Sequence, residues 1–327
     1  MKIVSVIGAR PQFIKAAPVS RALAGAGIKE ILVHTGQHYD REMSGNFFSE
    51  LELKPPKYNL ELGGGPQGEQ TGKMLWKLEP ILLREKPDKV LVYGDTNSTL
   101  AGSLCAVKLH IPVAHVEAGL RSFNRRMPEE INRVMADHVS SLLFCPTETA
   151  VKNLKNEGIN KGVYLVGDVM YDTIRMFAGK AEKNTALLEK FGVSLRNYFL
   201  ATVHRAENTD DPRRLKLLVS ALSEISGTIA PVIMPLHPRT RKVLEKMKMK
   251  FGGGVKAVKP ASYIEMQTLL HHARGLLTDS GGMQKEAAIH RVPCVTLRDE
   301  TEWVETVSFG ANTIAGLNFN RIVAAAK

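Results

Sequence analysis

Short apolar runs alternate with segments of helical length along almost the whole chain, and this alternation constrains the fold more than any other feature. Such runs are typical of strands in a parallel sheet, and the longer segments between them suit crossover helices. The first series covers residues 3–7, 31–34, 90–93, 113–116, 142–145 and 164–166. The second covers residues 199–203, 232–235, 255–258, 276–278 and 294–297. The pattern predicts an α/β protein with two doubly wound, Rossmann-like sheets in tandem.

The length of the chain also indicates two domains. Its 327 residues exceed the size at which one hydrophobic core usually stops growing. The segment 166–184 lies between the two series and carries the Gly, Asp and Lys residues that suit a passage between domains. We place the boundary near Asp168, which gives domains of residues 1–168 and 169–327, and we expect the active site in the groove between them.

Composition narrows the class of protein and its partners. No apolar stretch reaches the ~18 residues of a membrane-spanning candidate, and Met1 leads directly into a strand-like run. We therefore expect a soluble, cytoplasmic protein without membrane insertion. Cys105, Cys145 and Cys294 lie far apart beside apolar residues, which favours buried free thiols. The net charge of +11 permits an anionic partner, but aromatic residues are too sparse to favour nucleic acid.

The first predicted strand leads into the turn VIGARPQFIKAAP, which carries cations where an anion would bind. A dinucleotide enzyme would show three spaced glycines here, and this turn does not. Gly8 supplies the turn, Arg10 brings a cation to its tip, and Pro11 begins a helix whose free amides face an anion. Lys15 adds a second cation one turn later. The pattern favours an anion site over ordinary surface charges.

A second anion site is predicted at TDSGGMQKEA, after the run 276–278. Ser280, Gly281 and Gly282 open a helix, so successive backbone amides and one hydroxyl suit a diphosphate. Glu286 faces the same side of the helix start, and its carboxylate suits the two hydroxyls of a ribose. Together these residues indicate a site for a nucleoside diphosphate.

Carboxylates follow two neighbouring predicted strands, which suggests acid and base chemistry at one sheet edge. Asp95 and Glu117 end these strands, and paired acids of unequal pKa are a common means of moving protons. Asp95 also suits a helix N-cap, whereas Glu117 would otherwise be an unpaired buried charge. Glu129 stands at a helix start, where the helix dipole and an i,i+4 pair with Arg133 explain it on structural grounds alone.

His204 ends the first predicted strand of the second series. A histidine at that position suits the role of a hydrogen-bond donor to a diphosphate or that of a general acid. His237 occupies the equivalent end of the next strand, although Pro238 makes a turn role equally suitable. The remaining histidines lack the spacing of metal ligands.

Six motifs occur in order along the chain: GARPQFIKAAP, GDTNST, HVEAGLR, PEEINR, TVHRAEN and TDSGGMQKEA. Together they resemble the motif set of the non-hydrolysing UDP-N-acetylglucosamine 2-epimerases, over nearly the whole chain. The resemblance implies two Rossmann-like domains in the GT-B-like arrangement of nucleotide-sugar glycosyltransferases, a homodimer, a UDP-sugar substrate and no cofactor. It also implies inversion of C2, from UDP-GlcNAc to UDP-ManNAc, by anti elimination of UDP to a glycal and re-addition of UDP.

The resemblance also assigns roles to residues of this chain. It implies that Asp95, Glu117 and Glu129 are acid/base carboxylates, which overrides the structural explanation of Glu129 and leaves open which of them takes the C2 proton. His204 is expected to be a catalytic residue beside the diphosphate. The substrate-binding residues that it implies are Arg10, Lys15, Arg133, Met266, Ser280, Gly281, Gly282 and Glu286.

Two positions depart from the familiar bacterial members and leave the sugar open. Trp303 stands where those members carry an arginine near the substrate, and Gln12 stands where they usually carry Glu. Both residues resemble the branch that epimerises UDP-2,3-diacetamido-2,3-dideoxyglucuronic acid. A retaining UDP-sugar glycosyltransferase of the same fold is an alternative of another class, and hydrolysing relatives, which release free N-acetylmannosamine, are a third.

Overall fold

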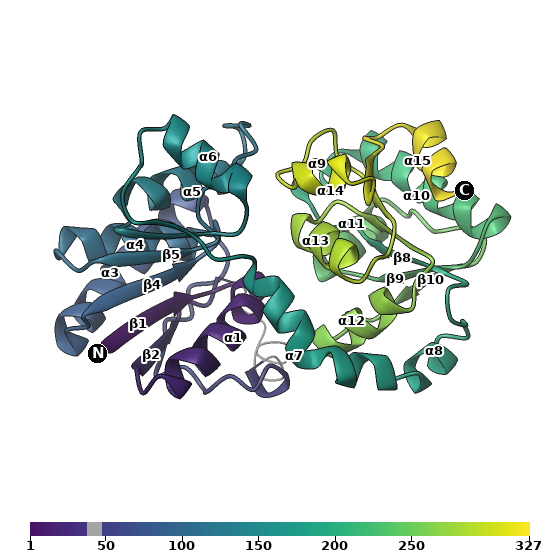
Figure 1. Ribbon diagram of the computed structural model, residues 1–327. Helices are drawn as coiled ribbons and strands as arrows, with labels where there is room; N and C mark the ends of the chain where they lie inside the picture. Colours follow the sequence, from purple (N-terminus) through teal and green to yellow (C-terminus); the bar gives the residue numbers. More distant parts are fainter. Residues whose placement is uncertain (38–47) are drawn as a thin grey trace. The chain divides into compact units, whose positions relative to one another are not determined.

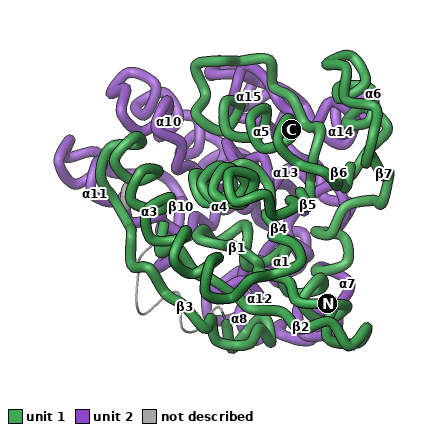
Figure 2. The backbone as a smooth tube through the Cα atoms, turned by 90° about the vertical axis from the view of Figure 1, so that its left-hand side faces the viewer, with its two compact units in different colours: residues 1–173 green, residues 174–327 purple. Residues whose placement is uncertain are grey.

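The computed structural model describes residues 1–37 and 48–327 and contains two compact units, Met1–Thr173 and Ile174–Lys327 (Figure 1; Figure 2). We call them unit 1 and unit 2. Helix α7 (Val169–Lys183) contains the division between them, and Asp168 directly precedes this helix.

Unit 1 is built on a seven-stranded sheet with the order β3-β2-β1-β4-β5-β6-β7. All pairs of neighbouring strands run parallel. The strands are β1 (Lys2–Ile7), β2 (Lys29–His34), β3 (Tyr58–Asn59), β4 (Lys89–Tyr93), β5 (Val113–Val116), β6 (Leu142–Cys145) and β7 (Val163–Leu165). The helices are α1 (Arg10–Gly25), α3 (Gln67–Glu85), α4 (Asn97–Lys108), α5 (Pro128–Val139) and α6 (Glu148–Asn156).

Unit 2 contains a six-stranded parallel sheet with the order β10-β9-β8-β11-β12-β13. The strands are β8 (Phe199–Thr202), β9 (Val232–Pro235), β10 (Val255–Val258), β11 (Gly275–Thr278), β12 (Cys294–Thr296) and β13 (Asn312–Ile314). The helices are α8 (Ala186–Lys190), α9 (Ala206–Thr209), α10 (Pro212–Thr228), α11 (Pro238–Lys246), α12 (Tyr263–His271), α13 (Gly281–Ile289), α14 (Val304–Ser308) and α15 (Phe319–Ala326). Two parallel sheets flanked by helices confirm the predicted fold class.

Each sheet buries both of its faces under helices. In unit 1, Val4 and Val6 of β1 pack on the face covered by Met74 and Leu78 of α3. In unit 2, helices α10, α11 and α15 contribute to one core cluster, while α8, α12 and α13 contribute to the other. Because strands buried on both faces carry apolar residues throughout, they are recognisable as continuous runs in the sequence.

Each sheet has one point where the strand order reverses. It lies between β1 and β4 in unit 1 and between β8 and β11 in unit 2. The loops after such strands leave in opposite directions, and open α/β sheets bind ligands there. The motifs GARPQF and GDTNST follow β1 and β4, while TVHRAEN and TDSGG follow β8 and β11. Four of the six sequence motifs therefore lie at the two switch points.

Close packing at the first switch point requires a glycine. A Cβ atom at Gly8 would lie 2.0 Å from Oγ1 of Thr35 and 2.1 Å from Oγ of Ser98. Elsewhere, the three cysteines are buried and free, as predicted. Among the helices of residues 1–37 and 48–327, none is long and apolar enough to cross a membrane.

Candidate active site

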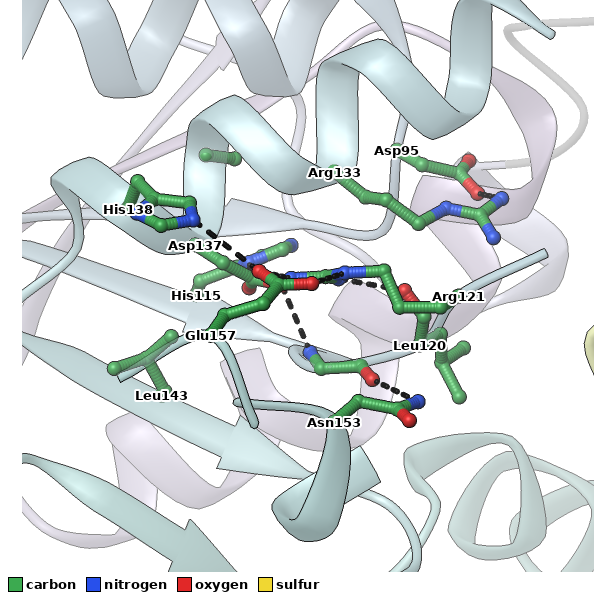
Figure 3. A network of polar contacts seen from close by, with 12 residues as sticks. Asp95, His115, Leu120, Arg121, Arg133, Asp137, His138, Leu143, Asn153 and Glu157 are labelled. Carbon is green, nitrogen blue, oxygen red and sulfur yellow. Dashed lines mark hydrogen bonds and ion pairs between the residues drawn. The ribbon is translucent and has the colours of Figure 1, made fainter. Parts of the chain in front are cut away.

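Asp95 lies at the switch point of unit 1, two residues after β4. Its carboxylate forms an ion pair with the guanidinium of Arg133, which extends from α5 (Figure 3). The side chain of Asp95 is 31% exposed and that of Arg133 is 3% exposed. Helix α4 is capped by Thr96, whose hydroxyl accepts a hydrogen bond from the amide of Thr99, so the N-cap explanation of Asp95 is wrong. Asp95 is a partly accessible carboxylate beside a buried cation.

Glu117 directly follows β5, the neighbour of β4, and its φ of 70° lies in the left-handed region. A non-glycine residue held there stores strain of the kind that clusters at functional sites. Its buried carboxylate forms an ion pair with the ammonium of Lys15 from α1, so this charge does have a partner. A Cβ at Gly94 would lie 3.0 Å from Lys15 Nζ and 3.1 Å from Glu117 Oε2, so the pair lies against the loop that carries Asp95. Arg10, the first residue of α1, is half-buried.

The two glutamates at the start of α5 have different surroundings. Glu130 is buried and accepts hydrogen bonds at 2.9 Å from the amide and hydroxyl of Ser122 and from the amide of Phe123. It also lies 3.2 Å from Arg133, so the ion pair within the helix involves Glu130 rather than the Glu129 expected from the spacing. Glu129 is half-buried. The ion pair therefore belongs to Glu130, and of the two structural explanations only the favourable position in the first turn of α5 remains for Glu129.

A buried polar network behind these loops was not predicted from the sequence (Figure 3). The carboxylate of Asp137 in α5 lies 2.7 Å from His115 Nδ1, 2.7 Å from Arg121 Nη1 and 3.0 Å from the amide of Gly119. The other ring nitrogen of His115 lies 2.7 Å from the carbonyl oxygen of Gly94. One carboxylate thus fixes the loops that follow both β4 and β5. The available signal was His115, a polar residue inside the apolar run 113–116.

Charges within this network stabilise the ionised form of Asp137. Burial penalises that form, but the His115 imidazole and the Arg121 guanidinium outweigh the penalty and hold the pKa of Asp137 below its usual value. Arg121 also donates to Glu157 at 2.6 and 2.8 Å, and this hydrogen bonding lowers the pKa of Glu157. Asp137 is therefore a fixed charge that positions the loops.

Asp279 has the corresponding place at the switch point of unit 2. It is fully buried, and one carboxylate oxygen accepts hydrogen bonds from the amides of His204 and Arg205 and from the side chain of Asn208, at 3.1, 3.0 and 3.0 Å. The His204 imidazole, 40% exposed, lies 3.5 Å from Asp279 and stacks near His237 with ring centroids 5.7 Å apart. Sequence reasoning identified His204 but missed Asp279, although the motif TDSGG contains it.

The turn Ser280, Gly281, Gly282 begins α13, as predicted. Ser280 is the N-cap, and its hydroxyl accepts a hydrogen bond from the Met283 amide at 3.4 Å. A Cβ at Gly281 would lie 2.0 Å from Glu302 Oε1, so any larger residue there would displace the Glu302 side chain. A Cβ at Gly282 would approach only Ser280 Oγ, at 3.9 Å, among the described residues, so Gly282 leaves space above the helix N-terminus.

The remaining predicted binding residues of unit 2 are buried. Glu286 of α13 accepts a hydrogen bond from Gln267 Nε2 at 2.8 Å. Met266 is 6% exposed and belongs to a core cluster. Beside the turn, the ammonium of Lys285 lies 4.1 Å above the ring centroid of the buried Trp303, within the range of a cation–π contact.

Comparison with known proteins identifies the family. The family model described as UDP-N-acetylglucosamine 2-epimerase matches residues 21–327. A UDP-N-acetylglucosamine 2-epimerase homolog of Methanococcus maripaludis is 56% identical over 99% of this chain and 91% of its own length. The UDP-2,3-diacetamido-2,3-dideoxy-D-glucuronate 2-epimerase of Pseudomonas aeruginosa is 53% identical over 100% of this chain and 92% of its own.

A solved structure extends the likeness to three dimensions. The crystal structure of Methanocaldococcus jannaschii UDP-GlcNAc 2-epimerase in complex with UDP-GlcNAc and UDP has a TM-score of 0.94 and 49% identity, covering 99% of this chain and 91% of that chain. The fold and these relatives define an isomerase of the epimerase type. The chain belongs to the UDP-N-acetylglucosamine 2-epimerase family, as its six motifs predict.

Proposed function

We propose that this protein inverts C2 of UDP-N-acetylglucosamine to give UDP-N-acetylmannosamine, with UDP retained in the product. The main support is the pair of carboxylates in unit 1: Asp95 and Glu117 follow adjacent strands, and each lies beside a cation. Such an epimerase needs acid and base groups at the sugar and hydrogen-bond donors at the diphosphate. The residues of unit 1 suit the first task and those of unit 2 suit the second.

The proposed reaction has two halves that balance. In the first, a carboxylate takes the C2 proton, the electrons of the C–H bond form the C1=C2 double bond of a glycal, and UDP leaves with the electrons of the C1–O bond. In the second, a proton is delivered to the opposite face of C2, and the UDP oxygen re-forms its bond to C1. Asp95, Glu117 and Glu129 are the proposed proton donors and acceptors, because elimination and re-addition on opposite faces need more than one such group.

Departure of UDP develops negative charge on the diphosphate. We assign its stabilisation to the amides at the N-terminus of α13, where Gly282 leaves space, and to the imidazole of His204. Donors aimed at charge that develops during the reaction lower its barrier, because they bind the transition state more strongly than the substrate. Glu286 is the proposed partner of the ribose hydroxyls.

A second candidate substrate is UDP-2,3-diacetamido-2,3-dideoxyglucuronic acid. It is favoured by Trp303 beside the turn of α13 and by Lys285 above its ring, because a uronic acid carries a carboxylate that a cation would recognise. The P. aeruginosa relative with that substrate in its name shares 53% identity with this chain. The reaction at C2 would be the same for either sugar.

Proton NMR in D₂O separates these functions. The purified protein is incubated in parallel with UDP-N-acetylglucosamine and with the diacetamido uronic acid nucleotide, and the C2 signal and products are followed. The C2-deuterated manno epimer with UDP attached is expected from UDP-N-acetylglucosamine. Turnover of the uronic acid alone transfers the function to the second candidate, and free sugar contradicts retention of UDP. Absence of exchange with both substrates, in protein that binds UDP, overturns the epimerase proposal.

We also propose that the protein forms a homodimer, as the family resemblance implies. Helix α3 leaves Trp76 74% exposed and Leu83 55% exposed, and their i,i+7 spacing puts them on one face of the helix. Exposed apolar residues grouped in this way mark an interaction surface. Analytical ultracentrifugation should give a dimer for the wild type and a monomer for Trp76→Glu, and a monomeric wild type contradicts the proposal.

A further inference from the structure

We propose that Gln267 and His290 are positioning residues that hold Glu286 in the orientation in which its carboxylate binds the ribose. The inference rests on the proposed function, because it takes Glu286 as the ribose partner. Neither residue belongs to the six motifs that carry the family resemblance.

The three side chains form a continuous hydrogen-bonded chain between α12 and α13. Nε2 of Gln267 donates to Oε2 of Glu286 at 2.8 Å, and Oε1 of Gln267 lies 2.7 Å from Nε2 of His290. Gln267 is 1% exposed and Glu286 is 4% exposed. Hydrogen bonds between buried groups are stronger than those in water and costly to break, so this chain restricts the carboxylate.

The Glu286 carboxylate determines which group is the donor in every hydrogen bond of this series of side chains. An ionised Glu286 only accepts, so the amide nitrogen of Gln267 must face it and the amide oxygen must face His290. His290 therefore carries a proton on Nε2 and donates it. Its Nδ1 lies 3.2 Å from Nδ1 of His271, which then has to be the donor of that pair. Turning the Gln267 amide over would place two oxygens against each other at Glu286.

The surroundings of His290 keep it neutral, in agreement with this direction. Burial, helped by the nearby charges of His271, Arg196 and His272, lowers the pKa of His290 to about 4. A neutral imidazole has one donor and one acceptor nitrogen, which is the arrangement that the chain requires. The ionised Glu286 at one end of the chain and the neutral His290 at the other therefore require the same orientation of the Gln267 amide.

The hydrogen bond to one oxygen of Glu286 restricts the rotation of its carboxylate. A ribose hydroxyl then meets an acceptor that is already oriented, and binding loses less conformational freedom than it would at a mobile side chain. The expected effect is on recognition of the nucleotide, with little effect on the proton transfers assigned to unit 1.

The test compares binding of UDP and 2′-deoxy-UDP by isothermal titration calorimetry. The wild type should prefer UDP by about tenfold or more, the size expected for a hydrogen bond to a charged group. Gln267→Leu should reduce the preference below about threefold, because it removes the donor to Glu286, and His290→Leu should give an intermediate value. Thr268→Val is the matched control: among the described residues its hydroxyl donates to the backbone carbonyls of Ala181 and Ile264 and not to Glu286, so its loss should leave the preference intact.

The result that would contradict the proposed ribose role of Glu286 differs from the result that would contradict the positioning role of Gln267 and His290. A wild type that binds both nucleotides equally overturns the ribose role of Glu286, and with it that part of the proposed function. A wild type that prefers UDP while Gln267→Leu and His290→Leu keep the same preference overturns the positioning inference alone. Should Gln267→Leu fail to fold, His290→Leu at its less buried site provides the same comparison.

Discussion

In each unit, one buried polar side chain bridges the two sides of the switch point. The bridging group is neutral in unit 1 and charged in unit 2. In unit 1 the neutral amide of Gln12 accepts from the amides of Gly8 and Ala9 at 2.7 and 3.1 Å and donates to the Tyr93 carbonyl at 2.9 Å. In unit 2 the buried carboxylate of Asp279 accepts from the backbone and side chain of the opposite loop. Each bridge ties the loop after the first strand of its sheet to a strand across the switch point.

The difference extends to the other polar groups at the two switch points. Unit 1 gathers carboxylates, and Lys15 and Arg133 each place a cation beside one of them, which suits proton transfer. Unit 2 gathers donors at a helix N-terminus, which suits the binding of an anion. The same α/β framework therefore presents different groups in the two units, depending on which side chains follow the strands, and the proposed function assigns chemistry to unit 1 and diphosphate binding to unit 2.

The largest effect is expected from Glu117→Gln, which should separate chemistry from binding. Removing a positioned acid or base typically costs about 10²–10⁴ in rate, so C2 proton exchange in D₂O should fall by that factor while the affinity for UDP stays within about threefold. Glu286→Gln should do the reverse and weaken UDP binding. Glu69→Gln, which alters only an exposed pair with Lys73, is the control. Undiminished exchange in Glu117→Gln would remove Glu117 from the catalytic assignment.

The second effect concerns Asp137, which holds the loops of unit 1. Asp137→Asn removes one of the two carboxylates that pair with the buried Arg121, the other being that of Glu157, and breaking a buried ion pair costs about 3 kcal/mol. Unfolding of unit 1 is followed by hydrogen-exchange mass spectrometry of its peptides, because its one tryptophan, Trp76, is already exposed in the folded chain.

The difference in stability between the wild type and Asp137→Asn should depend on pH in one direction. Because the folded pKa of Asp137 is lowered, its stabilisation is present above the ordinary carboxyl pKa of about 3.9 and is lost as pH falls through the folded value. The stabilities of Asp137→Asn and the wild type should therefore differ most near neutral pH and converge in acid. A difference that is constant with pH would mean that Asp137 acts through packing rather than through charge.

The fold could be predicted from the sequence because its strands are buried on both faces. An apolar run such as 90–93 is visible without knowledge of its neighbours, and polar residues that follow the runs within two positions, such as Asp95 and Glu117, are candidate site residues for the same reason. The short strand β3 (Tyr58–Asn59) has too few residues to form such a run.

The supporting contacts could not be predicted in the same way. Asp137, Gln267 and Asp279 contact residues that are distant in the sequence, and a polar residue in a helix or loop gives no sign of its partner. Similarly, the spacing rule chose Glu129 for Arg133, but the chain pairs Arg133 with Glu130 and with Asp95 across the unit. Local rules identify candidate partners, and tertiary packing selects among them.

The two bridges at the switch points give the third prediction. Asp279→Ala leaves several donors without an acceptor and should destabilise unit 2 by about 2–3 kcal/mol, since hydrogen bonds to a charged group are the stronger kind. Gln12→Ala should destabilise unit 1 by about 1–2 kcal/mol, because the amide makes neutral hydrogen bonds. Urea unfolding measures each, followed by the fluorescence of the buried Trp303 for unit 2 and by hydrogen exchange of its peptides for unit 1. Equal costs would show that the charge of the bridge is unimportant for stability.

The smallest effect concerns acid sensitivity. As the pH is lowered, unit 2 should unfold before unit 1. Burial lowers the pKa of His290 from its ordinary 6.5 to about 4. Between these pH values the imidazole of His290 binds a proton in the unfolded chain but not in the folded chain. His290 therefore does not reduce the free energy of unfolding above pH 6.5, and reduces it increasingly as the pH falls towards 4. His290→Leu should reduce this loss by about 1 kcal/mol in unit 2, whereas His110→Leu, at an exposed site of unit 1, should not. Because Asp137 loses its contribution only at lower pH, hydrogen exchange during acid titration should increase in the peptides of unit 2 before it increases in those of unit 1. The opposite order would show that the charge network of unit 1, rather than the buried histidine of unit 2, is the first element to fail in acid.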